Sequence, residues 1–425
     1  MKNLIFNSIL NLIYITLKSD FKVGEKMDIV IIGGGASGLV ASIYLSKKYN
    51  VTILERNEVL GKKILATGNG RCNYFNEDFN INHYRSSDID ILNKIINNEN
   101  KNKVLSFFDN IGIIPKIKNS CYYPYSNKAI SVYNALLNEV KNNDINVICN
   151  SKIKEIKYDN KYTIILEDRI ITCDKLVIAT GSNAGTNYKE NFGLDYLKKL
   201  GHSIIEPVPA LVKLISDAKY LKKWDGIRSD VKLSLYENDT LIGKSEGEAM
   251  FTSYGISGIC TFDLSGRVNR GLLKKYREEI EIDFMPYIKY EEFINYINER
   301  NDKLKNRTIK ELFEGMLNNK LIDILLDEAK INKDRYWNNL NRNDKEKIKD
   351  IFKKFRINII GSKGYNEAQV MSGGIPLNEI NINNMESKIQ DNLYILGELI
   401  DVDADCGGFN LGFAFLTAII LGENI

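Results

Sequence analysis

The sequence predicts an α/β protein built on a Rossmann-like parallel sheet, with an inserted β-barrel-like domain and a helical subdomain. Three apolar runs that each stop at a glycine favour the parallel sheet: 28–32 before Gly33, 175–179 before Gly181, and 393–396 before Gly397. Strands that end together in such a sheet place their turns at one edge, where α/β sheets bind ligands. The three glycine turns are therefore expected to lie side by side.

The first turn has the GxGxxG spacing of dinucleotide-binding units. It lies between a β-branched strand and a helical stretch, and an acidic residue ends the next strand about 20 residues further on. The glycines let the backbone approach a pyrophosphate, the helix N-terminus offers unpaired N–H groups, and the carboxylate can accept from ribose hydroxyls. The alternative is a glycine turn in an ordinary α/β unit. The predicted adenine dinucleotide site comprises Gly33, Gly35, Ala36, Ser37, Gly38, Glu55 and Arg56.

The strand at 393–396 is remote in sequence from the other two, so the dinucleotide domain is expected to be discontinuous. It would span 27–206 and resume at 365–425, around an insert at 207–364. In the β-rich part of the insert, 207–289, alternating Val231, Leu233 and Leu235 before a turn at 237–239 predict a hairpin. Helical spacing of apolar residues within 290–355 predicts a helical subdomain whose apolar stripe is core.

The composition is that of an ordinary globular protein. Of 425 residues 44% are hydrophobic, and 58 basic against 55 acidic residues leave a net charge of +3, which argues against nucleic acid as the main partner. The six cysteines show no paired CxxC spacing, so we expect reduced thiols, a cytoplasmic setting and no metal site.

Residues 1–26 form a separate apolar segment behind Lys2. Asn7, Ser8 and Asn11 interrupt it, and its uncharged stretch is too short to span a bilayer, so we expect no stable membrane association. Met27 directly precedes the first strand. The segment is therefore expected to be an over-extended start or an additional amphipathic arm.

Further motifs follow in order along the chain. The segment 61–73 reads GKKILATGNGRCN and 251–258 reads FTSYGISG; later come SGGI at 372–375, MESK at 385–388, GELIDVD at 397–403 and GGFNL at 407–411. Together they resemble the BaiN-like (YhiN) family of FAD-binding flavoproteins, also labelled aminoacetone-oxidase-type NAD(P)/FAD-dependent oxidoreductases. The resemblance runs from Met27 to Gly422 and implies a two-part FAD domain, an inserted barrel-like domain with helices, and oxidoreductase chemistry on a poorly defined substrate.

The residues themselves also favour a flavin. The glycine-rich stretch 68–73 can pass close to a cofactor, with Arg71 as a phosphate or flavin partner; the alternative is a surface loop with a solvated arginine. Gly407 and Gly408 precede a helical run whose N-terminus can point N–H groups at the flavin ring. The resemblance places Glu398 and Asp401 near the pyrophosphate and ribityl chain. The other predicted FAD-binding residues are Lys63, Gly70, Cys72, Ala179, Thr180, Gly181, Gly397, Asn410 and Leu411.

An acid or base is difficult to assign, because the chain has only two histidines, His83 and His202, and neither lies in a glycine motif. His202 is expected to be structural, and the lone thiol of Cys72 is expected to be inert. Where the family usually has His, this chain has Ser253, so Ser253 and Tyr254 are the catalytic candidates, with core packing as the alternative for Tyr254.

One local departure from the family pattern and one local match are also expected to matter. The departure is Ala404-Asp405-Cys406, which stands in place of the more usual Gly and Thr before Gly407 and adds a carboxylate and a thiol to the loop expected to face the flavin. The match is the run 122–129, which resembles the family's aromatic-Pro-Ser-Lys-Ala segment, and Ser126 in it is expected to cap the helix that follows.

These observations favour an FAD-dependent oxidoreductase that acts on a small-molecule substrate. No second GxGxxG unit is visible, so NAD(P)H is expected only as a transient electron donor. The alternatives are a flavin-binding sensor or partner protein without turnover, flavin-dependent RNA modification, and an NAD-linked dehydrogenase. The last would leave the motifs at 61–73 and 397–410 without a ligand.

Overall fold

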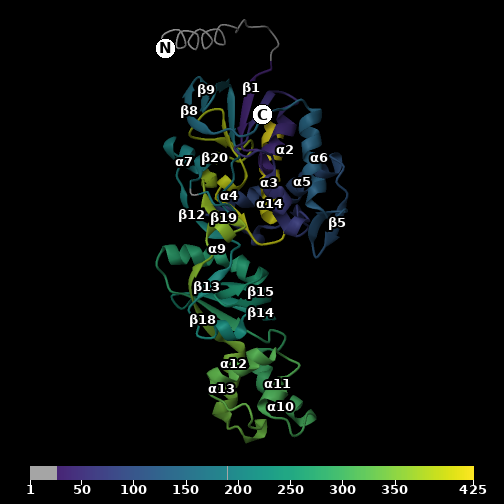
Figure 1. The fold of residues 1–425 in the computed structure, drawn as a ribbon, viewed down its shortest axis with the longest axis vertical. Coiled ribbons are helices and arrows are strands. Elements are labelled where there is room, and N and C mark those ends of the chain that lie inside the picture. The colour runs from purple at the N-terminus through teal and green to yellow at the C-terminus, as the bar shows by residue number, and fades with distance from the viewer. Residues whose placement is uncertain (1–25, 189) are drawn as a thin grey trace.

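The computed structural model describes residues 26–188 and 190–425. Figure 1 shows three parts stacked along the longest axis: a domain with the parallel sheet, then a β-barrel, then a group of helices at the end furthest from the C-terminus. The expected fold class, a Rossmann-like domain with a barrel insert and a helical subdomain, is confirmed. The exact domain limits stay predictions.

A seven-stranded sheet in the order β20-β21-β22-β11-β1-β2-β7 forms the core of the first domain. The five strands from β22 to β7 in this order run parallel. Because β22 pairs with β11, the C-terminal part of the chain completes the sheet that the N-terminal part begins. The strands are β1 Asp28–Ile32, β2 Asn50–Leu54, β7 Asn146–Ile148, β11 Lys175–Ile178, β20 Ile380–Asn381, β21 Glu386–Ser387 and β22 Leu393–Ile395.

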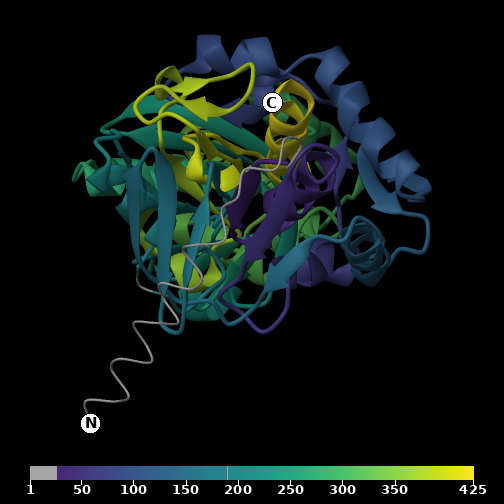
Figure 2. The same ribbon diagram turned by 90° about the horizontal axis from the view of Figure 1, so that it is seen from above.

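Two largely buried helices, α2 (Ala36–Leu45) and α14 (Phe409–Asn424), pack against each other beside this sheet (Figure 2). The Cβ that Gly422 lacks would lie 2.2 Å from the Cβ of Tyr44, so a side chain at 422 would force the two helices apart. The C-terminal helix is therefore part of the core of the domain.

Ser126 does not cap helix α6 (Ala129–Asn142), and this prediction was wrong. The helix begins after Lys128 without a side-chain cap, and the Oγ of Ser126 lies 2.7 Å from the Oγ of Ser131 instead. Burial of one face of α6 against the domain replaces the cap as its main support.

The other elements of this domain are α3 Lys62–Ala66, α4 Ile89–Ile95, α5 Asn98–Asn110, α7 Phe192–Lys199, β3 Phe75–Asn76, β4 Tyr84–Arg85, β5 Pro115–Lys118, β6 Cys121–Pro124, β8 Ile153–Asp159, β9 Lys161–Leu166, β10 Ile170–Cys173, β19 Val370–Gly374 and β23 Asp403–Ala404.

The insert contains a closed barrel in the order β13-β16-β15-β14-β17-β18. The predicted hairpin is confirmed: Asn238 and Asp239, both with positive φ, connect its two strands, and the alternating Val231, Leu233 and Leu235 are fully buried. β13 pairs with β18, which follows the helical segment, so residues from both sides of that segment close the barrel. The strands are β13 Leu214–Ser216, β14 Arg228–Glu237, β15 Thr240–Thr252, β16 Gly255–Ser257, β17 Glu278–Asp283 and β18 Phe355–Ser362.

Helix α9 (Ile259–Leu273) joins the barrel to the first domain, because it contacts both β15 of the barrel and β12 (Ile205–Ala210). The helical subdomain holds α10 Phe293–Lys303, α11 Ile309–Phe313, α12 Asn319–Ala329 and α13 Arg342–Lys353. Its apolar stripe is core, as expected: Phe293, Phe313 and Phe352 are completely buried, and the rings of Phe313 and Phe352 lie 4.4 Å apart.

The predicted N-terminal extension falls almost wholly outside the described residues. Among the residues that the structure describes, no helix is both long enough and apolar enough to cross a bilayer.

Candidate cofactor-binding site

The three glycine turns lie together, as the sequence predicts. The Cβ that Gly33 lacks would lie 2.5 Å from the carbonyl oxygen of Ala179, so the first and second turns touch. The missing Cβ of Gly397 would lie 2.9 Å from the Oγ of Ser37, so the third turn touches the helix that follows the first. Backbone from the ends of three parallel strands therefore converges at one edge of the sheet.

The three glycines of the first turn have different surroundings. Gly33 has a φ of +104°, and the missing Cβ of Gly38 would lie 1.9 Å from the carbonyl oxygen of Gly33, so these two allow the tight turn and the close packing of α2. At Gly35, by contrast, no heavy atom of the described residues lies within 4 Å of the missing Cβ. Gly35 thus leaves open space at the N-terminus of α2, where a pyrophosphate fits.

The carboxylate of Glu55 is buried at the end of β2. Its Oε2 accepts from the backbone N–H of Gly34 at 2.8 Å, and its Oε1 accepts from the backbone and side-chain nitrogens of Asn57. A carboxylate offers about four acceptor positions, so one remains for a ribose hydroxyl. Next to it, the guanidinium carbon of Arg56 lies 3.7 Å from the ring centre of Tyr188.

Glu398 connects the second and third turns. Its carboxylate accepts from the backbone N–H groups of Met371 at 2.9 Å and Ser182 at 3.3 Å, and the missing Cβ of Gly181 would lie 3.7 Å from it. The Nζ of Lys63 lies 3.6 Å from the same carboxylate. Four segments that are distant in sequence therefore meet at Glu398.

The start of α14 faces the glycine-rich segment 68–73. Gly408 has a φ of +94°, and its missing Cβ would lie 2.6 Å from the Oδ1 of Asn73. The Nδ2 of Asn76 donates to the carbonyl oxygen of Gly407 at 2.8 Å. Glycine is needed at 408 because any side chain would collide with Asn73.

Two buried polar atoms in this region lack partners. The Oδ1 of Asn73 and the Oγ1 of Thr180 are buried and find no hydrogen-bond partner among the described residues. Such an unsatisfied group costs about 1–3 kcal/mol, which a bound molecule with matching donors would recover. The Oγ1 of Thr180 lies against Gly193, whose missing Cβ would be 2.2 Å from it, whereas the Oδ1 of Asn73 lies beside Gly408 at the start of α14. Asn73 and the open space at Gly35 therefore fit a cofactor bound along the turns. Asn73 was not among the predicted binding residues, although it ends the segment that contains them.

Several predicted cofactor residues use their side chains within the protein. The Oδ2 of Asp401 accepts from the backbone N–H of Ser87 at 2.8 Å, and the side chain of Asn410 bonds both backbone groups of Ala404. Burial raises the pKa of the Cys72 thiol to about 11. The Nε of Arg71 donates to the carbonyl oxygen of residue 68, Leu411 packs against the apolar core, and Gly70 has a φ of +77°. For Asp401, Asn410 and Cys72, the backbone groups are therefore what remains to offer a ligand.

Ser253 and Tyr254 lie in the turn between β15 and β16 of the barrel. The backbone N–H of Ser253 donates to Asp225 at 2.7 Å, and the Nζ of Lys363 lies 4.0 Å from the ring centre of Tyr254. These interactions join the turn to the segment just before β14 and to the residue just after β18. Their role in catalysis stays a prediction.

His202 belongs to a buried network in the first domain. Its Nδ1 lies 2.7 Å from Glu379 and its Nε2 lies 2.9 Å from the Oγ of Ser387, the distances of a Ser-His-Glu triad. However, that Oγ also accepts from the backbone N–H groups of Ile389 and Gln390, and Ser387 is 6% exposed. The hydroxyl therefore has no free side for a substrate, and the network holds the turn after β21.

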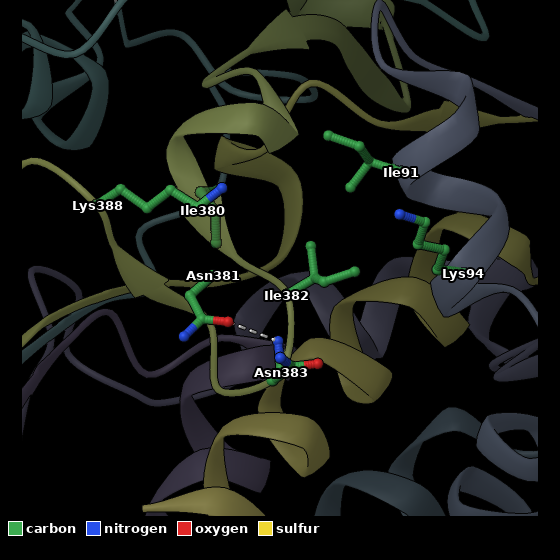
Figure 3. Close-up of a pocket in the computed structure, with 7 residues that line it drawn as sticks. All are labelled: Ile91, Lys94, Ile380, Asn381, Ile382, Asn383 and Lys388. Atoms are coloured by element: carbon green, nitrogen blue, oxygen red, sulfur yellow. Dashed lines mark hydrogen bonds between the residues drawn. The ribbon is translucent and has the colours of Figure 1, made fainter.

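A separate pocket of about 370 Å³ lies between α4 and the segment around β20 (Figure 3). Its lining combines isoleucines with asparagines and lysines, and none of the predicted cofactor residues contributes to it. Because its walls contain no glycine turn, we assign the cofactor site to the converging turns instead. The pocket is lined by Ile91, Lys94, Ile380, Asn381, Ile382, Asn383 and Lys388.

Sequence reasoning also missed a polar cluster beside the start of α14, formed by His83, Arg85, Asp405 and Asp263. His83 and Asp405 are 322 positions apart and still lie within hydrogen-bond distance. No sequence pattern predicts a contact between two residues at that separation.

Comparison with known proteins identifies the family. Residues 27–424 match the model described as HI0933-like protein Rossmann domain. This chain belongs to that family. It is 32% identical over 398 residues to a 3-dehydro-bile acid delta(4,6)-reductase of Clostridium scindens, covering 92% of this chain and 97% of the relative. The expected BaiN-like identity is confirmed, and with it membership of a family of FAD-dependent oxidoreductases.

More distant relatives include a ribosomal RNA dihydrouridine synthase of Haemophilus influenzae, 26% identical over 399 residues, which covers 92% of this chain and 96% of the relative. Among solved structures, a 3-ketosteroid-delta4-(5alpha)-dehydrogenase of Rhodococcus jostii RHA1 is similar with a TM-score of 0.49 at 11% identity, covering 96% of this chain and 98% of that chain.

Proposed function

We propose that this protein is an FAD-dependent reductase of a small molecule and that it adds two hydrogens across a carbon–carbon double bond conjugated to a carbonyl. The observation that carries the proposal is the convergence of the three glycine turns, at Gly33 with Ala179 and at Gly397 with Ser37. A site of this kind suits one long cofactor better than two separate ligands.

The chain offers distinct groups to the two ends of FAD. The N-terminus of α2, with Gly35, and the carboxylate of Glu55 would hold the pyrophosphate and the adenosine ribose. Gly407, Gly408 and the N-terminus of α14 would face the flavin ring, with Asn73 accepting from it. When bound, the flavin supplies hydride transfer, and a helix N-terminus near its pyrimidine side favours the reduced anion.

The names of the relatives support the proposed substrate class. One relative is named as a delta(4,6)-reductase, that is, an enzyme that adds hydrogen at carbon–carbon double bonds. The other is named for its product, dihydrouridine, which is uridine with two added hydrogens. The higher identity to the bile acid enzyme, together with the near-neutral charge of this chain, favours a small apolar substrate over RNA. NAD(P)H is proposed as a transient electron donor. Six free thiols suit a reducing compartment such as the cytoplasm.

The proposal can be tested with purified, FAD-loaded protein under anaerobic conditions. We expect NADH or NADPH to bleach the flavin. A steroid dienone, in which two carbon–carbon double bonds are conjugated to a ketone, should then restore the oxidised spectrum. Reoxidation by unmodified ribosomal RNA and not by the dienone would favour RNA modification. A yellow protein that no reductant bleaches would support a sensor. A protein that binds NAD and no flavin would overturn the assignment.

A further inference from the structure

His83 and Arg85 lie directly beside the start of α14, outside every glycine motif. The ring of His83 stacks on Phe409, the first residue of α14, with the ring centres 4.4 Å apart and an angle of 16° between the planes. β4, which contains Arg85, pairs with β23, and the carbonyl oxygen of His83 accepts from the backbone N–H of Asp405. The segment 83–85 therefore supports the loop that leads into Gly407 and Gly408.

His83 is held between two carboxylates. Its Nδ1 lies 2.9 Å from the Oδ2 of Asp405, and its Nε2 lies 2.8 Å from the Oδ2 of Asp78. Both nitrogens can donate at once only in the protonated imidazolium form. Burial alone would lower the pKa of His83, but the hydrogen bonds to Asp405 and Asp78 outweigh burial and raise it above its ordinary value.

Asp405 links this histidine to the insert domain. The Nη2 of Arg85 donates both to Asp405 and, at 3.1 Å, to the carbonyl oxygen of Asp263 on α9. The backbone N–H of Cys406 donates to the Oδ1 of Asp263 at 2.8 Å. One connected network thus runs from His83 through the loop before Gly407 to helix α9.

The cluster contains further charged groups, and the balance between its carboxylates and its cationic groups changes when His83 loses its proton. Asp403 lies 3.9 Å from Arg85, and Arg267 of α9 also faces the cluster. Burial raises the pKa of both Asp403 and Asp263 to about 6, so near neutral pH these carboxyls ionise as well. If His83 then lost its proton, the cluster would keep its four carboxylates and only two of its three cationic groups, and Asp405 would lose one of its two cationic partners.

We propose that protonated His83 is a positioning residue for FAD: by fixing Asp405, it keeps the bend at Cys406–Gly408 in the conformation that faces the cofactor. This inference rests on the proposed cofactor site. Because the folded-state pKa of His83 is raised, its contribution is complete below the ordinary value of 6.5 and is lost as pH rises through the raised value. FAD affinity therefore falls with rising pH, and, by linkage, FAD binding raises the pKa of His83 further.

The first experiment measures FAD affinity of the deflavinated full-length protein from pH 5.5 to 9 by quenching of flavin fluorescence. We expect the Kd to rise about 5- to 20-fold across the His83 transition. The His83→Gln and Asp405→Asn variants should bind with an affinity that no longer depends on this transition. Asp90→Asn, an exposed carboxylate on α4, is the matched control and should behave as the unmodified protein.

The second experiment follows the ring signals of the histidines by NMR, with and without FAD. The chain has only His83 and His202, so the signals that vanish in His83→Gln are assigned directly. We expect a pKa above 6.5 for His83 that rises on FAD addition. An FAD affinity independent of pH, or a His83 pKa that FAD does not change, would overturn the inference alone. Failure to bind FAD at any pH would overturn the proposed function together with it.

Discussion

Gly397 stands against Ser37 so closely that its missing Cβ would lie 2.9 Å from the serine Oγ, which brings the C-terminal part of the chain onto the first glycine turn. Gly397 also has a φ of +65°. Both the conformation and the contact exclude a side chain at this position.

Gly397→Ala should therefore weaken FAD binding at least tenfold, because a left-handed conformation costs about 1–2 kcal/mol for alanine and the methyl group would displace Ser37. Fluorescence titration with FAD measures the loss. Gly361→Ala, where no heavy atom of the described residues lies within 4 Å and φ is not in the left-handed range, is the matched control. Equal affinity of the two variants would contradict the close contact.

Gly35→Val should separate folding from cofactor binding. The missing Cβ of Gly35 points into open space, and its φ of −81° suits any residue, so the apoprotein should lose only about 1 kcal/mol of stability. The valine side chain would, however, occupy the space assigned to the pyrophosphate. We expect loss of FAD after purification with a melting temperature of the apoprotein close to that of the unmodified one. Retained FAD would show that the pyrophosphate lies elsewhere.

The stability of the barrel should depend on Glu278. This residue is 1% exposed, both of its carboxyl oxygens lack partners among the described residues, and Glu237 lies opposite it on β14. Burial, and then repulsion by Glu237, raise the pKa of Glu278 to about 8, from an ordinary value of 4.5. As pH rises between these values, the unfolded chain ionises while the folded one does not, so stability falls.

Glu278→Gln should remove that decline and raise the free energy of unfolding at pH 8 by roughly 2–4 kcal/mol. Urea denaturation at pH 5 and pH 8 measures the difference. Glu246→Gln, an exposed carboxylate on β15, which β14 separates from the strand of Glu278, should leave the pH dependence as it is. A parallel decline in both variants would argue against a buried, protonated Glu278.

The His202 network should contribute stability and no hydrolysis. Ser387→Ala removes the acceptor of two backbone N–H groups and the partner of His202, which should cost about 1–3 kcal/mol of unfolding free energy. Ser229→Ala, at a half-buried serine of the barrel whose Oγ makes only a 3.5 Å contact with the carbonyl oxygen of Asp230, should change little. A fluorophosphonate probe should leave Ser387 unlabelled. Labelling that Ser387→Ala abolishes would reveal a nucleophile that the described contacts conceal.

The fold class could be predicted because its signals are local. Apolar runs that stop at Gly33, Gly181 and Gly397 identify parallel strands, and the alternation at 231–235 identifies the hairpin, since periods of two and glycine turns depend on neighbouring residues only. The prediction that Ser126 caps α6 also used a local signal, and it was wrong. A capping preference is worth only about 1 kcal/mol, and burial of one face of α6 outweighs it.

The sequence by itself determined which backbone segments can approach a dinucleotide, because glycines at turns such as Gly33, Gly397 and Gly408 combine a positive φ with a close approach of another chain segment. Only the tertiary structure decided which side chains remain available to the ligand. Asp401 and Asn410 bond to protein backbone, Asn73 is left without a partner, and His83 meets Asp405 across 322 positions. Apart from the local bonds of Asn410 to Ala404, these outcomes depend on contacts between remote segments, and such contacts leave no periodic trace in the sequence.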